Sequence, residues 1–317
     1  MRTQSEMRDV AVIVPTMRRP ESLARALQSL FAQAGGGDRL AAIVVVDNDP
    51  QATAGPVIAA LTSASPVPLV LIHEPRPGVA TARNAGLAAT DAPLIAFLDD
   101  DEAADPNWLS ALLAALDGTG ADVVFGPIRG QVPEGTGWTR AYLERFFGRQ
   151  GPAETGLLDH AYGCGNSLMK RATALPGAAP FDAGSDQSGG EDDVLFSGLA
   201  ARGGRFGWAA DAWVDEFAPP HRATMKYTLA RAFAYGQGPS QTAARDRHWG
   251  GVARWMLIGA AQTAAWGLVS IGLTLIRSPR RADTLDRTAR GIGKVLWMSG
   301  LEPHFYGARE LARLSKA

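Results

Sequence analysis

Short runs of apolar residues alternate with amphipathic segments along the first 130 residues of the chain. The apolar runs are continuous, which is typical of strands that are buried on both faces of a sheet. They lie at Val10–Val14, Ile43–Val46, Leu69–Ile72, Leu94–Leu98 and Val123–Phe125. Strands that alternate with helices predict an α/β fold with a mostly parallel central sheet flanked by helices.

The segments between these runs have the spacing of helix faces. One helix is expected to begin at Pro20, a residue type favoured in the first helical turn. Its apolar face consists of Leu23, Leu27, Leu30 and Phe31. Two more helices are predicted at Thr81–Ala89 and Pro106–Leu116, the latter with Asp105 as its N-cap.

The composition changes after Arg222, where Ala, Arg and Trp become frequent and the periodicity is helical. Residues 130–190 before it are rich in Gly and Pro and are expected to form loops around short helices. We therefore predict an α/β domain over residues 8–222 and a helical C-terminal region over residues 223–317.

The bulk composition excludes several classes of protein. With 46% hydrophobic and 20% charged residues, the chain is neither disordered, nor collagen-like, nor a membrane protein with many spans. A single cysteine, Cys164, excludes a disulfide framework and a Cys-rich metal site, and we interpret it as a small packed residue. The first ten residues have no apolar core, so we expect no secretory signal and a cytoplasmic location.

Charge is distributed unevenly along the chain. Residues 1–220 contain 16 Lys and Arg and 27 Asp and Glu, whereas residues 221–317 contain 15 and 5. An acidic first part is suited to metal ions and not to nucleic acid. A basic second part is suited to an anionic surface, such as a layer of phospholipid headgroups.

One segment within the basic part, Trp255–Ile276, has no formal charge and lies between Arg254 and Arg277. Its length fits a single membrane span of about 20 residues. Polar residues such as Gln262 and Ser270 dilute it. Two interpretations remain open, a buried helix or hairpin of a helical subdomain, and a membrane-inserted or interfacial segment with an arginine collar.

Carboxylates follow the fourth predicted strand, in the sequence Asp99-Asp100-Asp101-Glu102. Ligands of open α/β sheets bind outside the carboxyl ends of the strands, where these side chains are expected. Crowded carboxylates are unfavourable unless a cation shares the site, and carboxylate oxygens favour Mg²⁺ or Mn²⁺. The alternative is a solvated acidic loop without a ligand.

A second acidic cluster occurs in Gly189–Phe196, where Glu191, Asp192 and Asp193 open an apolar helix. One of these carboxylates could take a proton from a hydroxyl group while a neighbour holds an acceptor. Acidic residues also cap helices without any catalytic role, so that interpretation stands beside the first.

A cationic segment, Arg76–Gly86, places Arg83 near the start of a predicted helix. Its guanidinium could contact a diphosphate or balance the carboxylates. Pairing with a structural acid on the surface is the other interpretation. The chain lacks the sequence patterns of phosphate-binding P-loops, zinc peptidases and serine hydrolases, so none of these chemistries is expected.

These motifs, taken in order, resemble those of family 2 glycosyltransferases, which have the nucleotide-diphospho-sugar transferase (GT-A) fold. The matching segments are Val12–Arg19, Val44–Asp49, Gly78–Gly86, Ala96–Glu102, Gly165–Arg171 and Gly189–Asp193. With Trp213–Arg222 and the Arg-rich tail included, the pattern is similar to that of succinoglycan-type exopolysaccharide glucosyltransferases. The resemblance implies that residues 8–222 form the catalytic domain.

The resemblance also implies roles on the donor side. Pro15, Thr16 and Asp47 would border the nucleobase and ribose, and Arg83 would lie near the donor's diphosphate or ribose. Asp99 and Asp101 would form the D-x-D element, with Asp100 between them and Asp101 as the direct metal ligand. Many members have a histidine near the metal after the second acidic helix; here Asp215 would substitute for it as an oxygen ligand.

On the acceptor side, the resemblance implies that Asp192 is the catalytic base. Glu191 beside it would contact the acceptor, and Asn166 would lie in the acceptor-side loop. The expected reaction is inverting transfer, dependent on Mg²⁺ or Mn²⁺, from a nucleotide sugar, with UDP as the expected nucleotide. A glycan or a polyprenyl-linked acceptor at the inner face of the cell membrane would agree with the basic tail.

Two other functions are compatible with parts of this pattern. A non-catalytic sugar-nucleotide-binding or scaffold subunit of a polysaccharide assembly complex would keep the fold without turnover. An intact D-x-D element and Asp192 argue against it. A nucleotidyltransferase would be expected to have a Gly- and Lys-rich triphosphate loop near the N-terminus, and Val12–Arg19 is not such a loop.

Overall fold

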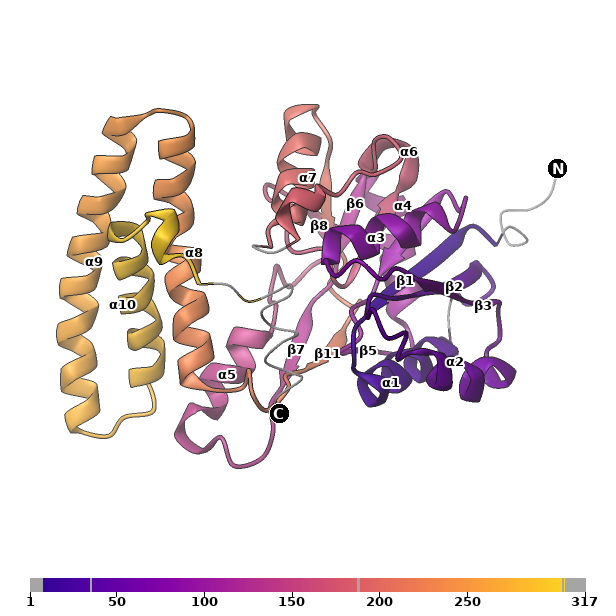
Figure 1. The fold of residues 1–317 in the computed structure, drawn as a ribbon, viewed down its shortest axis with the longest axis horizontal. Coiled ribbons are helices and arrows are strands. Elements are labelled where there is room, and N and C mark those ends of the chain that lie inside the picture. Colours follow the sequence, from indigo (N-terminus) through magenta and orange to yellow (C-terminus); the bar gives the residue numbers. More distant parts are fainter. Residues whose placement is uncertain (1–7, 35, 187–188, 304, 306–317) are drawn as a thin grey trace. The chain divides into compact units, whose positions relative to one another are not determined.

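The computed structural model describes residues 8–34, 36–186, 189–303 and 305 (Figure 1). These residues form two compact units. The first unit contains the described residues within 1–129 and 148–217, together with Phe305. The second contains residues 130–147 and the described residues within 218–304. The domain boundary expected after residue 222 stays a prediction.

The first unit is built on a mixed sheet in the strand order β3-β2-β1-β4-β9-β6-β10-β8. The strands are β1 (Val10–Thr16), β2 (Leu40–Asp47), β3 (Leu69–His73), β4 (Leu94–Phe97), β6 (Val123–Phe125), β8 (Gly156–Leu158), β9 (Ser167–Lys170) and β10 (Phe206–Trp208). Strands β1 to β4 are parallel, and β6 and β10 are parallel to each other. Strand β9 is antiparallel to both of its neighbours, and β8 is an antiparallel edge strand.

A smaller sheet has the order β5-β11-β7. Its strands are β5 (Glu102–Ala104), β11 (Val214–Phe217) and β7 (Ile128–Gln131). Strand β5 begins directly after the acidic run of residues 99–101, so this run lies in the connection between β4 of the larger sheet and β5 of the smaller one. Strand β11 is antiparallel to β5.

Helices cover both faces of the larger sheet. They are α1 (Pro20–Phe31), α2 (Gly55–Leu61), α3 (Val79–Ala88), α4 (Trp108–Thr119), α6 (Arg171–Ala174) and α7 (Glu191–Ala201). Short 3-10 turns lie at Thr62–Ala64 and Ala183–Ser185. Apolar side chains of α1, α2 and α4 join one core cluster, and those of α3, α6 and α7 join a second on the opposite face.

Strand β1 shows why its apolar run is continuous. Val10, Val12 and Val14 enter the first core, while Ala11 and Ile13 enter the second, and all five are fully buried. Successive side chains of a strand point to opposite faces, so a strand between two helical layers needs apolar residues at every position.

The five predicted strands and the three predicted helices of this region are confirmed, with ends that differ by a few residues. The predicted N-cap of α4 is wrong. The helix begins at Trp108 with Asn107 as its N-cap, and no side-chain cap bond is present there. Asp105 instead accepts a hydrogen bond from Arg129, and its carbonyl accepts from the Trp108 amide across a turn.

The second unit is helical, as the periodicity after Arg222 indicates. It contains α5 (Arg140–Phe147), α8 (Met225–Arg245), α9 (Trp249–Leu275) and α10 (Arg281–Val295), with 3-10 turns at Gly137–Thr139 and Ser299–Leu301. Helix α10 packs against both α8 and α9. Helix α5 joins this group, because Tyr142 donates a hydrogen bond to Asp286 at 3.0 Å and Arg145 pairs with Asp283.

Candidate active site

The strand order of the larger sheet reverses at β1 and β4, since β2 and β3 lie on one side and the later strands on the other. Ligands of α/β sheets bind at such a point, outside the carboxyl ends of the strands. Thr16 ends β1, and its hydroxyl donates a hydrogen bond to Asp100 at 2.7 Å. The first motif and the acidic run after β4 therefore meet at the switch point.

Arg19 compensates part of this negative charge. Its Nη1 lies 2.8 Å from Asp100 Oδ1 and 2.8 Å from Asp101 Oδ2. The pKa of Arg19 is raised, chiefly by Asp100 and against the effect of burial. Asp101, the expected metal ligand, thus already has one cationic partner.

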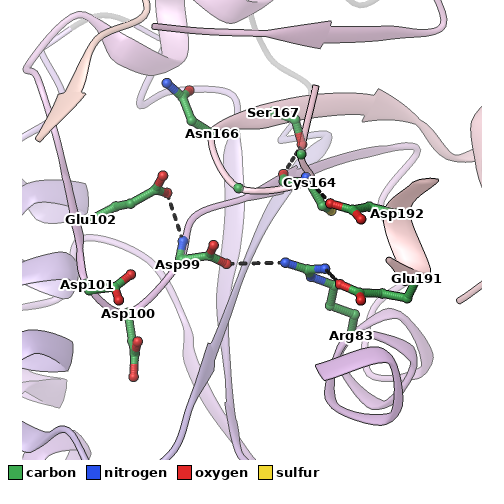
Figure 2. Close-up of polar contacts among 12 residues, drawn as sticks. Arg83, Asp99, Asp100, Asp101, Glu102, Cys164, Asn166, Ser167, Glu191 and Asp192 are labelled. Carbon is green, nitrogen blue, oxygen red and sulfur yellow. Dashed lines mark hydrogen bonds and ion pairs between the residues drawn. The ribbon is translucent and has the colours of Figure 1, made fainter. Parts of the chain in front are cut away.

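The second acidic cluster reaches the same place through Arg83. Helix α7 begins at Glu191, and Glu191 is ion-paired with Arg83 from α3. The same guanidinium lies 3.4 Å from Asp99 Oδ1 (Figure 2). Arg83 is 4% exposed and Glu191 5% exposed. The two acidic clusters, about 90 residues apart in the chain, are therefore joined by one buried cation.

A loop at Gly163–Asn166 also contacts both clusters. The backbone N–H of Cys164 donates a hydrogen bond to Asp192 Oδ2 at 3.1 Å (Figure 2). One residue further on, a Cβ added to Gly165 would lie 2.6 Å from Asp99 Oδ2, so only glycine allows this approach. Cys164 itself is buried, as expected of a packed residue.

Asn166 fixes this loop to the fold. Its side chain is fully buried and accepts a hydrogen bond from Trp108 Nε1 at 2.7 Å. It donates to the carbonyls of Pro127 and Ala212 at 2.8 and 3.0 Å. The Asn166 side-chain amide thus forms its hydrogen bonds within the protein. The backbone of the preceding residues, Cys164 and Gly165, lies against the acidic clusters.

Arg149 is a site residue that the sequence motifs did not indicate. Its Nη2 donates to the carbonyl of Gly163 at 3.0 Å, and its Nη1 donates to that of Gly165 at 2.9 Å. These carbonyls flank Cys164, whose amide binds Asp192. Burial lowers the pKa of Arg149, and the charges of Glu102 and Glu216 oppose that effect. Arg149 lies in the Gly- and Pro-rich segment, where no motif marks it.

Strand alternation separates Asp215 from Glu216 in β11. Glu216 pairs across the sheet with Glu102, while Asp215 pairs with Ala103. Asp215 accepts a hydrogen bond from Arg129 at 2.8 Å. Since neighbours in a strand point to opposite faces, Glu216 is the residue of this pair that shares a face with Glu102. The role of Asp215 as a metal ligand stays a prediction.

The carboxylates around the end of β4 resist ionisation. Burial raises the pKa of Asp99, and Arg83 opposes it. Burial and the charge of Asp99 raise the pKa of Glu102 well above its ordinary value. The pKa of Glu216 is also well above the ordinary value, because of burial and the charges of Asp101 and Glu102. Such crowding is relieved by a cation of higher charge than a single guanidinium.

This donor set fits a divalent cation in its chemistry. All of its side chains offer carboxylate oxygens, which Mg²⁺ and Mn²⁺ prefer. Within the part of the chain that the structure describes, no three His, Cys, Asp or Glu side chains converge as a complete metal site. A Mg²⁺ ion is commonly held by one or two carboxylates and by substrate phosphates, so a partial site is expected without the substrate.

Asp47 ends β2, and its carboxylate forms hydrogen bonds within the loop that follows. It is 1% exposed, and its two oxygens accept hydrogen bonds from the backbone amides of Asp49 and Ala54 at 3.1 and 2.6 Å. Its carboxylate therefore shapes the loop after β2. Pro15 lies within β1, directly before Thr16.

An α/β sheet with carboxylates and arginines gathered at its switch point is the arrangement of the nucleotide-diphospho-sugar transferase (GT-A) fold. A solved mannosyltransferase, PcManGT from Pyrobaculum calidifontis in complex with GDP-Man and Mn²⁺, superposes with a TM-score of 0.60 at 19% identity. The superposition covers 91% of this chain and 87% of that one. The fold is thus GT-A with a C-terminal helical extension.

The sequence relatives agree with the fold. Residues 11–174, more than half of the chain, match the family model described as Glycosyl transferase family 2. The succinoglycan biosynthesis protein ExoM of Rhizobium meliloti (strain 1021) is 30% identical over 309 residues, which is 97% of this chain and 98% of that protein. A pre-mycofactocin glycosyltransferase of Mycobacterium tuberculosis (strain ATCC 25618 / H37Rv) is 30% identical over 276 residues, 85% of this chain and 54% of that protein. The chain belongs to glycosyltransferase family 2 and is a glycosyltransferase.

Proposed function

We propose that this enzyme transfers a sugar, with inversion, from a nucleotide-diphospho-sugar to a hydroxyl group of a glycan or lipid-linked acceptor. The product would serve exopolysaccharide or other cell-surface polysaccharide synthesis. The similarity to a succinoglycan biosynthesis protein over nearly the whole chain supports this assignment. The observation that carries it is the joining of the two acidic clusters by Arg83 and by the Gly163–Asn166 loop.

Asp192 is the proposed catalytic base. It lies in the first turn of α7. Its Oδ2 is held by the Cys164 amide, which fixes the carboxylate without neutralising it. Asp192 would take the proton from the acceptor hydroxyl as its oxygen attacks the anomeric carbon from the face opposite the diphosphate. An α-linked donor would then give a β-linked product.

The donor would lie along the ends of β1, β2 and β4. Pro15, Thr16 and the loop that Asp47 shapes are proposed to border the nucleobase and ribose, with UDP as the nucleotide. Arg83 would lie near the diphosphate, where a buried guanidinium stabilises the negative charge that develops on the leaving group. Glu191, which Arg83 holds beside Asp192, is proposed to contact the acceptor.

Asp99 and Asp101 are the residues proposed to hold Mg²⁺ or Mn²⁺. The resemblance implies Asp215 as a further oxygen ligand, but we propose Glu216 in its place, because Glu216 shares a face of the smaller sheet with Glu102. Asp100, between Asp99 and Asp101, is tied to Thr16 and Arg19 and fixes the turn. When bound, a divalent ion would neutralise the diphosphate of the donor.

Arg149 is proposed as a positioning residue. It holds the carbonyls on both sides of Cys164 and thereby fixes the amide that orients Asp192. A lysine cannot make these divergent hydrogen bonds from one planar group. Asn166 anchors the same loop from the other side.

We also propose attachment of the enzyme to the inner face of the cell membrane. The similarity to a polysaccharide biosynthesis protein and the basic composition of residues 221–317 support it. Attachment would bring the site to a polyprenyl-linked acceptor.

A donor screen tests the proposed function. UDP-, GDP- and dTDP-sugars would be added to the purified protein with Mg²⁺, with Mn²⁺ or with EDTA, and its unfolding temperature recorded. A ligand that binds the native state alone raises that temperature. The expected result is a shift with one nucleotide class that EDTA abolishes, accompanied by release of the nucleoside diphosphate. No shift and no release with any nucleotide sugar would contradict the proposal.

A further inference from the structure

Helix α9 has an unusual surface for a helix of a small helical unit. Of the helices in the described residues, α9 is the one that is long and apolar enough to cross a membrane. Only 11% of its most apolar stretch is buried. Helices of water-exposed bundles bury their apolar face and expose their polar one. Helix α9 does the opposite.

The outward face of α9 is a continuous apolar stripe. Its members recur at helical spacing and are all exposed: Leu257, Ala261, Ala264, Leu268, Ile271 and Leu275. Three leucines in it, Leu257, Leu268 and Leu275, are 72%, 71% and 80% exposed. Single exposed apolar residues are ordinary, but a contiguous stripe marks an interaction surface.

The inward face of α9 consists of small and polar residues. Gly259 approaches α10 so closely that an added Cβ would lie 2.6 Å from the Gly291 carbonyl oxygen. Thr263 and the buried Ser270 lie on the same side of the helix. Small residues at helix contacts and large apolar residues facing outward are typical of helices in lipid.

The neighbour of α9 decides how it can meet a bilayer. Helix α10 runs alongside the middle of α9, because Gln262 donates to the Arg287 carbonyl at 2.8 Å and accepts from Lys294 Nζ at 3.1 Å (Figure 1). The Arg287 guanidinium also lies 4.3 Å from the centre of the Trp266 ring. A spanning α9 would take these cations into the hydrocarbon core, which is strongly unfavourable.

Charge identifies the kind of lipid. Arg254, Arg277 and Arg280 are exposed near the two ends of the stripe. Arginines near a membrane surface are attracted to anionic headgroups, and the basic excess of residues 221–317 adds to that attraction.

We propose that α9 lies flat in one leaflet of an anionic membrane, with the stripe from Leu257 to Leu275 inserted among the acyl chains and α10 on the water side. This deepens the proposed membrane attachment and rests on it. It is independent of the catalytic assignment, because vesicle binding needs no donor. The helix is thus an interfacial anchor and not a span.

Vesicle flotation of the full chain tests the surface. Binding to phosphatidylcholine vesicles containing phosphatidylglycerol should exceed binding to phosphatidylcholine alone by tenfold or more. The double variant Leu257→Gln/Leu268→Gln should lose at least tenfold in binding to the anionic vesicles. The matched control is Leu71→Gln/Leu157→Gln, which changes exposed apolar residues of the first unit and should bind as the wild type.

A depth measurement tests the orientation. Cys164 is buried, so an exposed cysteine introduced at Leu257 or at Leu268 can be labelled selectively with a fluorophore. Quenching by brominated lipids should place both labels at the same shallow depth. A label at Leu268 much closer to the bilayer centre than the label at Leu257 would mean that α9 spans and would overturn the proposal.

The remaining outcomes are equally decisive. Unchanged vesicle binding by Leu257→Gln/Leu268→Gln would show that the stripe is not the lipid surface. If that variant instead changed from dimer to monomer while keeping its vesicle binding, the stripe would be an interface between copies. Release of nucleoside diphosphate without vesicles should be unchanged in both double variants. If the wild type released no nucleoside diphosphate either, that result would count against the proposed function and not against the proposed membrane surface.

Discussion

Replacing Asp192 by asparagine separates its chemical role from its structural one. The asparagine carbonyl oxygen can still accept the hydrogen bond that the Cys164 amide donates at 3.1 Å, so the loop and the start of α7 should keep their form. The substitution removes one acidic group from the first helical turn, where such a charge contributes about 0.3–1 kcal/mol. The effect on the free energy of unfolding should therefore be small.

The effect on catalysis should be much larger, because an amide cannot take a proton from the acceptor hydroxyl. Loss of a general base lowers the rate by about 10²–10⁴-fold. That corresponds to roughly 3–5 kcal/mol in the activation barrier. The KM for the nucleotide sugar should change little, since the donor is proposed to contact the ends of β1, β2 and β4.

Asp193→Asn is the matched control for Asp192→Asn. It removes the same charge from the same helical turn, but Asp193 is exposed. Steady-state transfer kinetics and urea unfolding of both variants would be compared with the wild type. If Asp192→Asn kept more than half of the wild-type kcat, or if both variants lost the same activity, Asp192 would not be the base.

Three further substitutions test other parts of the site. Arg149→Lys should lower kcat about tenfold or more at an unchanged KM for the donor, because one ammonium nitrogen replaces the two guanidinium nitrogens that bind the two carbonyls; an unchanged kcat would remove its positioning role. Arg83→Met should lower the free energy of unfolding in urea by about 3–5 kcal/mol, since it leaves Glu191 buried without a partner, and Glu191→Gln in the same background should restore part of it. The pKa of Glu216 is raised in the folded protein, so the free energy of unfolding should fall as the pH rises through that pKa and the buried carboxyl group ionises. Glu216→Gln should flatten this fall in the free energy of unfolding, and it should also reduce the stabilisation that Mn²⁺ provides. Asp215→Asn should do neither.

Local patterns predicted most of the secondary structure of the first unit. The apolar runs predicted the parallel strands, and the central strands among them are buried on both faces, as Val10 to Val14 illustrate. The edge strand β3 is only partly buried, but its run of apolar residues is also continuous. Strand β9 was missed, because its residues lie in a Gly-rich segment and pair antiparallel between β4 and β6. Such pairing depends on contacts between residues far apart in the chain, which no local window contains.

The site was predictable in its motifs and not in its connections. The acidic runs and Arg83 could be identified from residue type and spacing. The link from Arg83 to Glu191 spans 108 positions, and Asp186 binds the N-terminus of α3 from 105 and 106 positions away. Alternation in β11 could have favoured Glu216 over Asp215 once that strand was recognised. Nothing in the local sequence marks Arg149.

The central claim is that the two acidic clusters form one site for a nucleotide sugar. The most direct measurement is a crystal structure with a nucleoside diphosphate and Mn²⁺, recorded at a wavelength where manganese scatters anomalously. The account predicts an anomalous peak beside Asp101, with the diphosphate against it and Asp192 facing the same space. A peak remote from residues 99–102, or a nucleotide bound away from both Asp101 and Asp192, would contradict it.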